Sequence, residues 1–390
     1  MHIARLAMEI VFWTCLGGLV YSYALYPVAI WVCARLFGRH PSAPGSLVDA
    51  ELPSVSVLIA AYNEETVIAE RIENALQLDY PDSKLEIVIA SDGSSDATND
   101  IVKRYSDPRV RLLEYGVRQG KAAVLNAAFP KLRGTIVVLT DANTRMDRHA
   151  VRNLVRWFRV PQVGVVCGRL VLIDPATGTN VDGLYWRYET FLKHCESRLG
   201  ALLGANGAIY AIRRELYAGI RRNTLIDDFV VPLLTRLRTG CSIEFDPDAL
   251  AYEETPAAIG SEFNRRARIG TGGFQSVPLL WTLLNPARGW ISFTYFSHKI
   301  TRWLCPFLLI GTFATSLFLV DRHPYDYLLA AQLALYLVAG AGTRVTSPGI
   351  ASRCLRLTTL FAGMNLALLV GFWRWVTTEP QGAWTRTARP

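Results

Sequence analysis

The sequence lacks the short patterns that identify several large enzyme classes. No Gly-x-Gly-x-x-Gly follows a predicted strand, so a dinucleotide-binding fold has no support, and neither a Walker phosphate loop nor a Gly-x-Ser-x-Gly elbow is present. The seven cysteines include no Cys-x-x-Cys pair, which argues against a zinc site or a disulfide framework. Such scattered cysteines favour buried thiols in a reducing compartment. Internal repeats and low-complexity tracts are also missing.

Charged residues are scarce as well. They make up 19% of the chain against 51% apolar residues, and the mean hydropathy of +0.21 is high for a soluble enzyme, which indicates membrane spans. The net charge of +8 suits an anionic lipid surface or a phosphorylated substrate, and we expect no nucleic-acid partner. Because 390 residues exceed what one hydrophobic core usually fills, we expect at least two folding units.

The first long segment without charge runs from Ile10 to Ala34. It is long enough to cross a bilayer and longer than the apolar region of a signal peptide. Arg35 and Arg39 follow it, so the positive-inside rule places the next part of the chain in the cytoplasm. We therefore interpret residues 1–40 as a transmembrane signal anchor and residues 41–52, with their proline and glycine breakers, as a linker.

From residue 53 onward, short apolar runs alternate with segments of helical character. The strands that this pattern predicts lie at residues 55–60, 85–90, 110–113, 135–140 and 163–167. The helices that it predicts lie at residues 66–78, from Asp96 onward and from Gly120 onward. Strands and helices that alternate at this spacing predict a doubly wound α/β domain.

Polar clusters follow three of these strands directly, at residues 62–65, 92–94 and 141–143. Ligands of α/β sheets collect beyond the carboxyl ends of the strands, so three clusters on one edge describe a site better than three unrelated turns. Asp141, with a second oxygen donor at Asn143, could hold a hard divalent cation against a diphosphate. An Asp in this position can also simply cap the following turn.

Two later segments add candidates for the same site. The small residues from Gly204 to Ala211 either let a ligand or backbone approach closely or form a tight loop before a strand. Asp227 and Asp228 open a helix that runs through Leu237. This pair either complements the helix dipole or provides a base of raised pKa, because neighbouring carboxylates disfavour each other's ionisation.

The last third of the chain returns to the membrane. Residues 259–302 read as interfacial helices, because the charge-free stretch 269–287 is too polar and too broken to span a bilayer. Residues 303–376 contain three candidate spans, at 303–320, 327–343 and 357–373, and residues 377–390 form a tail. One span before the domain and three after it predict a multi-pass protein of the inner (plasma) membrane, with the domain in the cytoplasm.

In their order and spacing, the segments Val57–Glu64, Ser91–Asp96, Arg118–Ala122 and Asp141–Asn143 resemble membrane-bound family 2 glycosyltransferases. This group includes cellulose, poly-N-acetylglucosamine and hyaluronan synthases. The resemblance covers about residues 53–275. It implies a GT-A fold over residues 53–258, a nucleotide-diphosphate sugar as donor, usually a UDP-sugar, and a divalent metal, Mg²⁺ or Mn²⁺.

The resemblance also gives roles to the residues that would bind the nucleotide. The first strand and its loop, with Ala61, Asn63 and Glu64, would meet the nucleotide, and Glu64 would approach the ribose or the base. Asp92 would accept a hydrogen bond from uracil. Lys121, in a Gly-Lys-Ala segment, would lie beside the donor.

Three acidic or amide positions take the catalytic and metal-binding roles in the same comparison. Asp141 matches the first acid of the Asp-x-Asp motif and Asn143 stands in place of the second, so both are the expected metal ligands. Asp228 matches the catalytic base of the Thr-Glu-Asp motif. Asp227 would then turn aside as a capping or orienting acid.

Arg265 and Arg268 fall where processive members carry Gln-x-x-Arg-Trp, and they would supply positive charge to the departing diphosphate. Ile269 replaces the Trp that helps to hold a growing chain, which argues against chain extension of the cellulose type. Four spans are also few for a polymer channel within one protomer. Polymer export would therefore involve oligomerisation or separate export partners.

The expected function is inverting transfer of a sugar from a UDP-sugar to a polysaccharide or lipid-linked glycan acceptor at the cytoplasmic face of the membrane. Processive synthesis of a β-linked polysaccharide is an alternative within the same chemistry. An alternative of another class is a membrane scaffold that senses nucleotide sugars without catalysis. The presence of Asp92, Asp141 and Asp228 together argues against the scaffold.

Overall fold

The computed structural model describes residues 2–39, 43–173, 183–254, 259–342 and 350–378. The chain divides into two compact units. Of the described residues, the helical unit comprises 2–29, 259–275, 295–342 and 350–378, and the sheet unit comprises 30–39, 43–173, 183–254 and 276–294.

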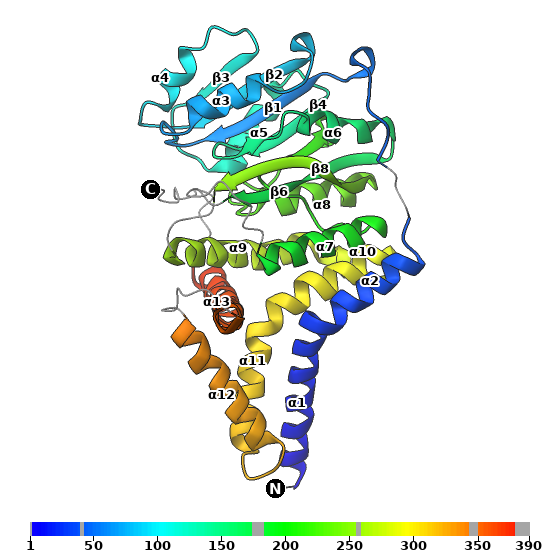
Figure 1. Ribbon diagram of the computed structural model, residues 1–390, viewed down its shortest axis with the longest axis vertical. Helices are drawn as coiled ribbons and strands as arrows, with labels where there is room; N and C mark the ends of the chain where they lie inside the picture. The colour runs from blue at the N-terminus through cyan, green and yellow to red at the C-terminus, as the bar shows by residue number, and fades with distance from the viewer. Residues whose placement is uncertain (1, 40–42, 174–182, 255–258, 343–349, 379–390) are drawn as a thin grey trace. The chain divides into compact units, whose positions relative to one another are not determined.

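The sheet unit is built on a mixed sheet of eight strands in the order β3-β2-β1-β4-β7-β6-β8-β5 (Figure 1). The strands are β1 (Val55–Ala61), β2 (Leu85–Asp92), β3 (Val110–Tyr115), β4 (Ile136–Asp141), β5 (Arg145–Met146), β6 (Val163–Ile173), β7 (Tyr210–Arg213) and β8 (Ser242–Glu254). The strands predicted from alternation are thus present, with ends shifted by a few residues at most except for β6, which extends to Ile173.

Most helices of the sheet unit lie between its strands in the sequence. They are α3 (Ile68–Leu76), α4 (Thr98–Lys103), α5 (Lys121–Ala128), α6 (Ala150–Val155), α7 (Leu184–Arg198), α8 (Asp227–Thr239) and α10 (Trp290–Thr294). Every residue of β1 and β2 is buried, as expected for strands that are covered on both faces. The helix predicted to start at Asp96 begins at Thr98, and Asp96 Oδ1 accepts a hydrogen bond of 3.0 Å from the Thr98 amide.

The register of the parallel strands brings their carboxyl ends to one edge. Ala60 of β1 lies opposite Asp141 of β4 and opposite Ala90 of β2, two residues before Asp92. The next neighbour, β7, runs antiparallel to β4 and pairs Tyr210 with Leu139. The half of the sheet that carries Asp92 and Asp141 is therefore parallel, as predicted, while the other half is mixed.

The helical unit contains α1 (His2–Val20), which continues through the π-helical turn Tyr21–Leu25 into α2 (Tyr26–Leu36), and residues 30–36 of α2 belong to the sheet unit. It also contains most of α9 (Ile259–Leu280), together with α11 (Thr301–Phe318), α12 (Tyr325–Gly342) and α13 (Ile350–Thr377). Helices α1 and α11 pack at small residues. A Cβ on Gly18 would lie 2.8 Å from a Leu308 methyl, so the two helices approach closely at this glycine.

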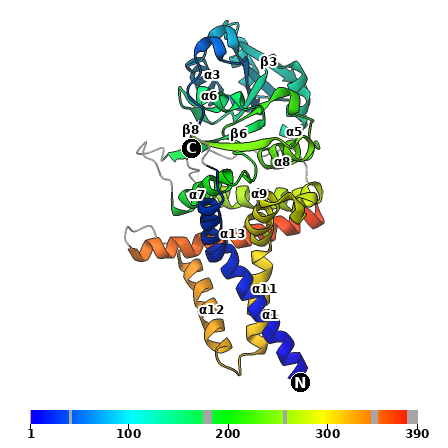
Figure 2. The ribbon, with the colours of Figure 1, turned by 90° about the vertical axis from the view of Figure 1, so that its right-hand side faces the viewer.

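Among the described residues, three helices are long and apolar enough to cross a membrane: His2–Leu36, Trp290–Phe318 and Leu355–Thr377. The apolar helix Tyr325–Ala341 is shorter, and the end of the predicted span 327–343 lies outside the described residues. Helices α1, α11 and α12 run lengthwise in both views, whereas α13 is seen end-on in Figure 1 and crosswise in Figure 2. These four helices therefore do not share one direction.

Candidate active site

The centre of the candidate site is a lysine between two carboxylates from distant parts of the sheet unit. Lys121, the first residue of α5, places its Nζ 2.8 Å from Asp141 Oδ1 at the end of β4. The same nitrogen lies 3.3 Å from Asp227 Oδ2 at the start of α8. Burial opposes the charge of Lys121, but the carboxylates of Asp141 and Asp227 outweigh it and hold the pKa of the ammonium above its ordinary value.

Asp227 was predicted to turn aside from the site. Instead it is buried and faces Lys121. Burial raises the pKa of Asp227, and the negative charges of Asp228 and Asp141 act in the same direction, while Lys121 opposes them. The sequence-based prediction failed because helix geometry fixes only the angle between adjacent side chains. It does not fix which of the two finds a cation from another element.

Asp228 and Asp141 face one space beside Gly207. The Gly207 amide donates a hydrogen bond of 3.0 Å to Asp228 Oδ2. A Cβ placed on Gly207 would lie 3.4 Å from Asp141 Oδ2 and equally 3.4 Å from Asp228 Oδ2. Glycine at this position thus leaves open the space between the two acids.

The small residues before β7 let the backbone of another segment approach closely, which was one of the two interpretations of this segment. Gly204 has φ of +79°, and a Cβ there would lie 3.0 Å from Phe229 Cα. The Ala205 amide donates to the carbonyl of Asp228 at 2.8 Å. The loop therefore lies against the start of α8 and holds the backbone of Asp228 in place.

Gly207→Ala provides a first test of this arrangement. The methyl group would be in ordinary van der Waals contact with both carboxylates, so we expect an unchanged melting temperature but a loss of turnover of about tenfold, because the reactants would be displaced. Gly45→Ala, where a Cβ would meet nothing within 4 Å, is the matched control. Equal turnover of both variants would show that the space beside Gly207 is not used.

Asp92 fixes the turn that precedes Lys121. Its two carboxylate oxygens accept hydrogen bonds from the amides of Gln119 (2.7 Å) and Gly120 (2.8 Å), and its side chain is fully buried. Gly120 has φ of +95°, which glycine adopts without strain. Asp92 thereby sets where α5 begins, and its reading of the nucleobase stays a prediction.

The end of β1 is tied to the loop after β2. The side-chain oxygen of Asn63 accepts from the Ser95 amide at 2.8 Å, and the Glu64 amide donates to Thr98 Oγ1 at 2.8 Å. Ala61, the last residue of β1, and Glu64 are both buried. These residues form one side of the carboxyl edge, and their contacts with a nucleotide stay predictions.

Comparisons with known proteins show which family the sequence of this part of the chain matches. Residues 56–218 match the model of the family described as glycosyl transferase family 2. Residues 56–218 form a family 2 glycosyltransferase domain. The resemblance inferred from the motifs is thus confirmed.

Three curated relatives of the glycosyltransferase domain are similar at low identity. The probable glycosyltransferase YdaM of Bacillus subtilis is 29% identical over 57% of this chain and 56% of its own length. A β-monoglucosyldiacylglycerol synthase of Trichormus variabilis is 27% identical over 61% of this chain and 52% of its own length. A poly-β-1,6-N-acetyl-D-glucosamine synthase of Staphylococcus epidermidis is 24% identical over 65% of this chain and 64% of its own length. The matched part therefore spans 52–64% of the length of these relatives.

A solved structure shares the fold over nearly the whole chain. The mannosyltransferase PcManGT of Pyrobaculum calidifontis, solved with GDP-Man and Mn²⁺, matches with a TM-score of 0.71 at 22% identity, over 96% of this chain and 99% of that one. Together with the family match, this confirms the predicted class, an α/β domain of GT-A type with apolar helices before and after it in the sequence.

Two residues of the sheet unit, Glu253 and Arg71, were missed by sequence reasoning. Asn143 Nδ2 donates a hydrogen bond of 2.5 Å to Glu253 Oε1 of β8, so a carboxylate from another strand stands beside the amide that replaces the second acid. Arg71 of α3 is buried behind β4 and donates to Thr140 Oγ1 at 3.2 Å. A charged residue on the apolar face of a predicted helix was the available signal for Arg71, whereas Glu253 had none.

Two expected residues lie outside the sheet unit. Arg265 and Arg268 belong to the part of α9 that lies in the helical unit, where Arg265 Nη1 is 3.6 Å from Glu262 Oε2. Their contact with a diphosphate at the glycosyltransferase domain stays a prediction.

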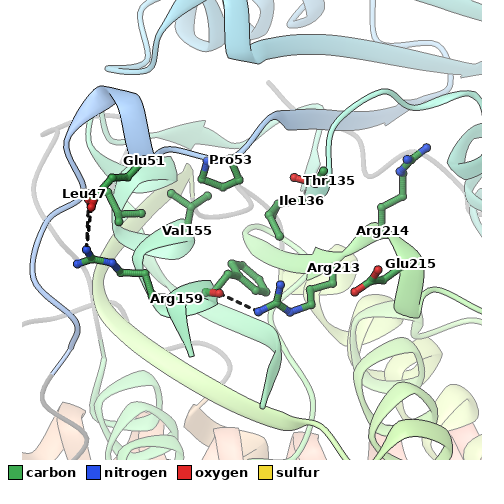
Figure 3. A pocket seen from close by; sticks show the side chains of 11 residues that line it. Leu47, Glu51, Pro53, Thr135, Ile136, Val155, Arg159, Arg213, Arg214 and Glu215 are labelled. Atoms are coloured by element: carbon green, nitrogen blue, oxygen red, sulfur yellow. Dashed lines mark hydrogen bonds and ion pairs between the residues drawn. The ribbon is translucent and has the colours of Figure 1, made fainter. Parts of the chain in front are cut away.

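A cavity of about 400 Å³ lies at the opposite edge of the sheet from Asp141, near the start of β4 (Figure 3). Its arginines have structural partners: Arg159 pairs with Glu51, and Arg213 donates to the carbonyls of Phe158 and Val163. Because ligands of α/β sheets bind at the carboxyl ends of the strands, the candidate active site is the one at Asp141 and not this cavity.

Proposed function

We propose that this chain transfers a sugar, with inversion at the anomeric carbon, from a nucleotide-diphosphate donor to a hydroxyl group of a glycan or lipid-linked acceptor. The observation that carries the proposal is the convergence of Asp141 and Asp228 on the space beside Gly207. Asp141, at the end of a strand, suits binding of the nucleotide-sugar donor, and Asp228 suits deprotonation of the acceptor hydroxyl.

In this proposal Asp228 is the general base. Its carboxylate takes the proton of the acceptor hydroxyl while that oxygen forms its bond to the anomeric carbon. The bond between the anomeric carbon and the diphosphate oxygen breaks in the same displacement, so an α-linked donor gives a β-linked product. The Gly207 amide, which donates to Asp228 Oδ2, holds the carboxylate in the orientation that this proton transfer needs.

A divalent metal fits the donor atoms at the site. Among the described residues no three His, Cys, Asp or Glu side chains are gathered to hold an ion by themselves. Mg²⁺ and Mn²⁺ prefer oxygen ligands, and Mg²⁺ at phosphate-transfer sites is usually held by one or two carboxylates together with substrate phosphates. The carboxylate of Asp141 and the side-chain oxygen of Asn143 would be the protein ligands, and the bound ion would neutralise charge on the departing diphosphate.

The pair of Asn143 and Glu253 gives a specific prediction about this metal site. Asn143→Asp would add a carboxylate at the metal site and should strengthen Mn²⁺ binding in the presence of nucleotide, whereas Glu253→Gln would remove a carboxylate beside it and should weaken that binding. The double variant reverses the hydrogen bond and keeps one carboxylate. We expect it to lie closer to the wild type than either single variant, with a coupling energy of about 1 kcal/mol or more.

Calorimetric titration of Mn²⁺ measures this coupling, and the melting temperatures of the four proteins control for folding. Additive effects, or a loss of Mn²⁺ affinity in Asn143→Asp alone, would contradict a joint role of the two side chains.

The proposal also specifies the nucleobase of the sugar donor. We propose a UDP-sugar, on the family resemblance and on the glycolipid and poly-N-acetylglucosamine synthases among the relatives. PcManGT was solved with GDP-Man, which makes GDP the natural competitor in the test. Displacement of a labelled UDP-sugar should need at least about ten times more GDP than UDP, a difference of about 1.4 kcal/mol in binding. Equal displacement would exclude selection for uracil.

The acceptor and the membrane side complete the proposal. One relative makes a glycolipid and another a polymer, so the chain either adds one sugar to a lipid-linked acceptor or extends a polymer. We propose single addition at the cytoplasmic face of the plasma membrane, because Ile269 stands where processive members carry Trp. Purified protein in nanodiscs with a panel of labelled nucleotide sugars tests this: a product of fixed size supports it, a ladder of sizes favours a processive synthase, and binding without transfer favours a scaffold.

A further inference from the structure

We propose that Lys121 is the resident cation of this site, and that a divalent metal gains access to Asp141 only when a nucleotide diphosphate draws the Lys121 ammonium away. The inference rests on the proposed function, in that it takes a nucleotide diphosphate as the ligand. It makes metal and nucleotide binding mutually dependent through one named side chain.

The position of the ammonium is the first support. Its nitrogen hydrogen-bonds Asp141 Oδ1 at 2.8 Å, so a cation already holds one of the two carboxylate oxygens that a metal could use. The second contact, 3.3 Å to Asp227 Oδ2, reaches an oxygen that is buried and has no hydrogen-bond partner among the described residues. The ammonium therefore compensates two acids at once.

Burial makes this compensation necessary. Asp227 is 6% exposed, and a buried carboxylate without a counter-charge is strongly unfavourable. Asp228 adds a further negative charge beside the pair, since its carboxylate borders the same space as Asp141. A metal that approaches the free site must therefore displace a well-held positive charge or bind next to it, and both lower the affinity for the metal.

A diphosphate changes this balance. It offers the ammonium new anionic partners and offers the metal phosphate oxygens, which complete a ligand set that the described residues do not provide alone. The backbone need not move, because Asp92 fixes the amides of Gln119 and Gly120 just before Lys121. Only the flexible side chain of Lys121 has to change its rotamer.

The test is the binding of Mn²⁺, followed by electron paramagnetic resonance on the full-length protein in nanodiscs, with and without UDP or GDP. Wild-type protein should bind Mn²⁺ at least about tenfold more tightly with nucleotide than without it. Lys121→Met should bind Mn²⁺ without nucleotide at least about tenfold more tightly than the wild type, and nucleotide should then add little. Lys121→Arg keeps the charge, so its affinity for Mn²⁺ without nucleotide should remain as low as that of the wild type.

Two controls separate this effect from others. Lys103→Met removes a charge at a surface residue that pairs with Glu114 and should behave as the wild type. Because Lys121→Met leaves Asp227 without its cation and could unfold the protein, Lys121→Met/Asp227→Asn is compared with Asp227→Asn, and the double variant should again bind Mn²⁺ more tightly.

The inference is overturned if removal of the Lys121 charge leaves Mn²⁺ affinity unchanged or lower in both comparisons, or if the wild type binds Mn²⁺ equally well with and without nucleotide. The proposed function is judged separately, by sugar transfer in the wild type. Transfer without the Lys121 effect would reject only this inference, and the Lys121 effect without transfer from any donor would reject only the proposed function.

Discussion

Replacement of Asp228 by Asn should lower the rate of sugar transfer by at least two orders of magnitude while the affinity for the nucleotide stays nearly the same. A positioned general base contributes a factor of about 10² to 10⁴ in rate, and Asn cannot take the proton of the acceptor hydroxyl. The Asn side chain still offers an oxygen to the Gly207 amide, so the loop should keep its place. Transfer rates and nucleotide titrations on the same preparations measure both quantities.

Asp227→Asn is the matched control for this prediction. Asp227 faces Lys121 and Asp228 faces Gly207, so the control changes the adjacent acid without touching the space beside Gly207. We expect the factor by which Asp227→Asn lowers the transfer rate to be less than a tenth of the factor for Asp228→Asn. If the two variants behave in the reverse order, the base is Asp227, and if both stay active, neither acid is the base.

Replacement of Asp141 by Ala should reduce turnover to background and abolish the metal dependence of nucleotide binding. This acid is the only proposed protein carboxylate for the metal, and it is also the closest partner of Lys121. Its loss removes a metal ligand and leaves the ammonium to Asp227 alone. The measurements are turnover with Mg²⁺ or Mn²⁺, and nucleotide binding with and without a chelator.

Asp82→Ala is a suitable control for Asp141→Ala. Asp82 is 78% exposed and pairs with Arg109, so the same change of charge occurs far from the carboxyl edge of the strands. Full activity of the wild-type protein in excess chelator would contradict the role of Asp141 as the ligand of a required metal, whatever the activity of the variant.

The sequence was informative where local patterns determine structure. Apolar runs buried on both faces predicted β1, β2 and β4, and the polar residues after them predicted that Asp92 and Asp141 share one edge. The Gly-Lys-Ala segment predicted Lys121 at the site, and its position beside a donor stays a prediction. Its distance to Asp227 could not be predicted, because it depends on how α5 and α8 pack across the sheet.

The same limit explains the other differences. Asn143 and Glu253 are 110 positions apart and meet because β5 pairs with β8, a pairing of only two residues per strand that has no sequence signature. The direction of α13 was also beyond reach, because length and composition determine whether a helix can span a bilayer but not how it packs on its neighbours.

The antiparallel β7 has a consequence for the synthesis of this protein on the ribosome. Strand β4 obtains its second neighbour only when β7 has been made, about seventy residues later, which at typical translation rates takes roughly 4 to 14 seconds. During this interval the apolar strand β4 has an unpaired edge, at which nascent chains can associate. A fragment that ends before Tyr210 should therefore aggregate when it is produced alone, so truncations intended to isolate the nucleotide half of the domain should extend beyond β7.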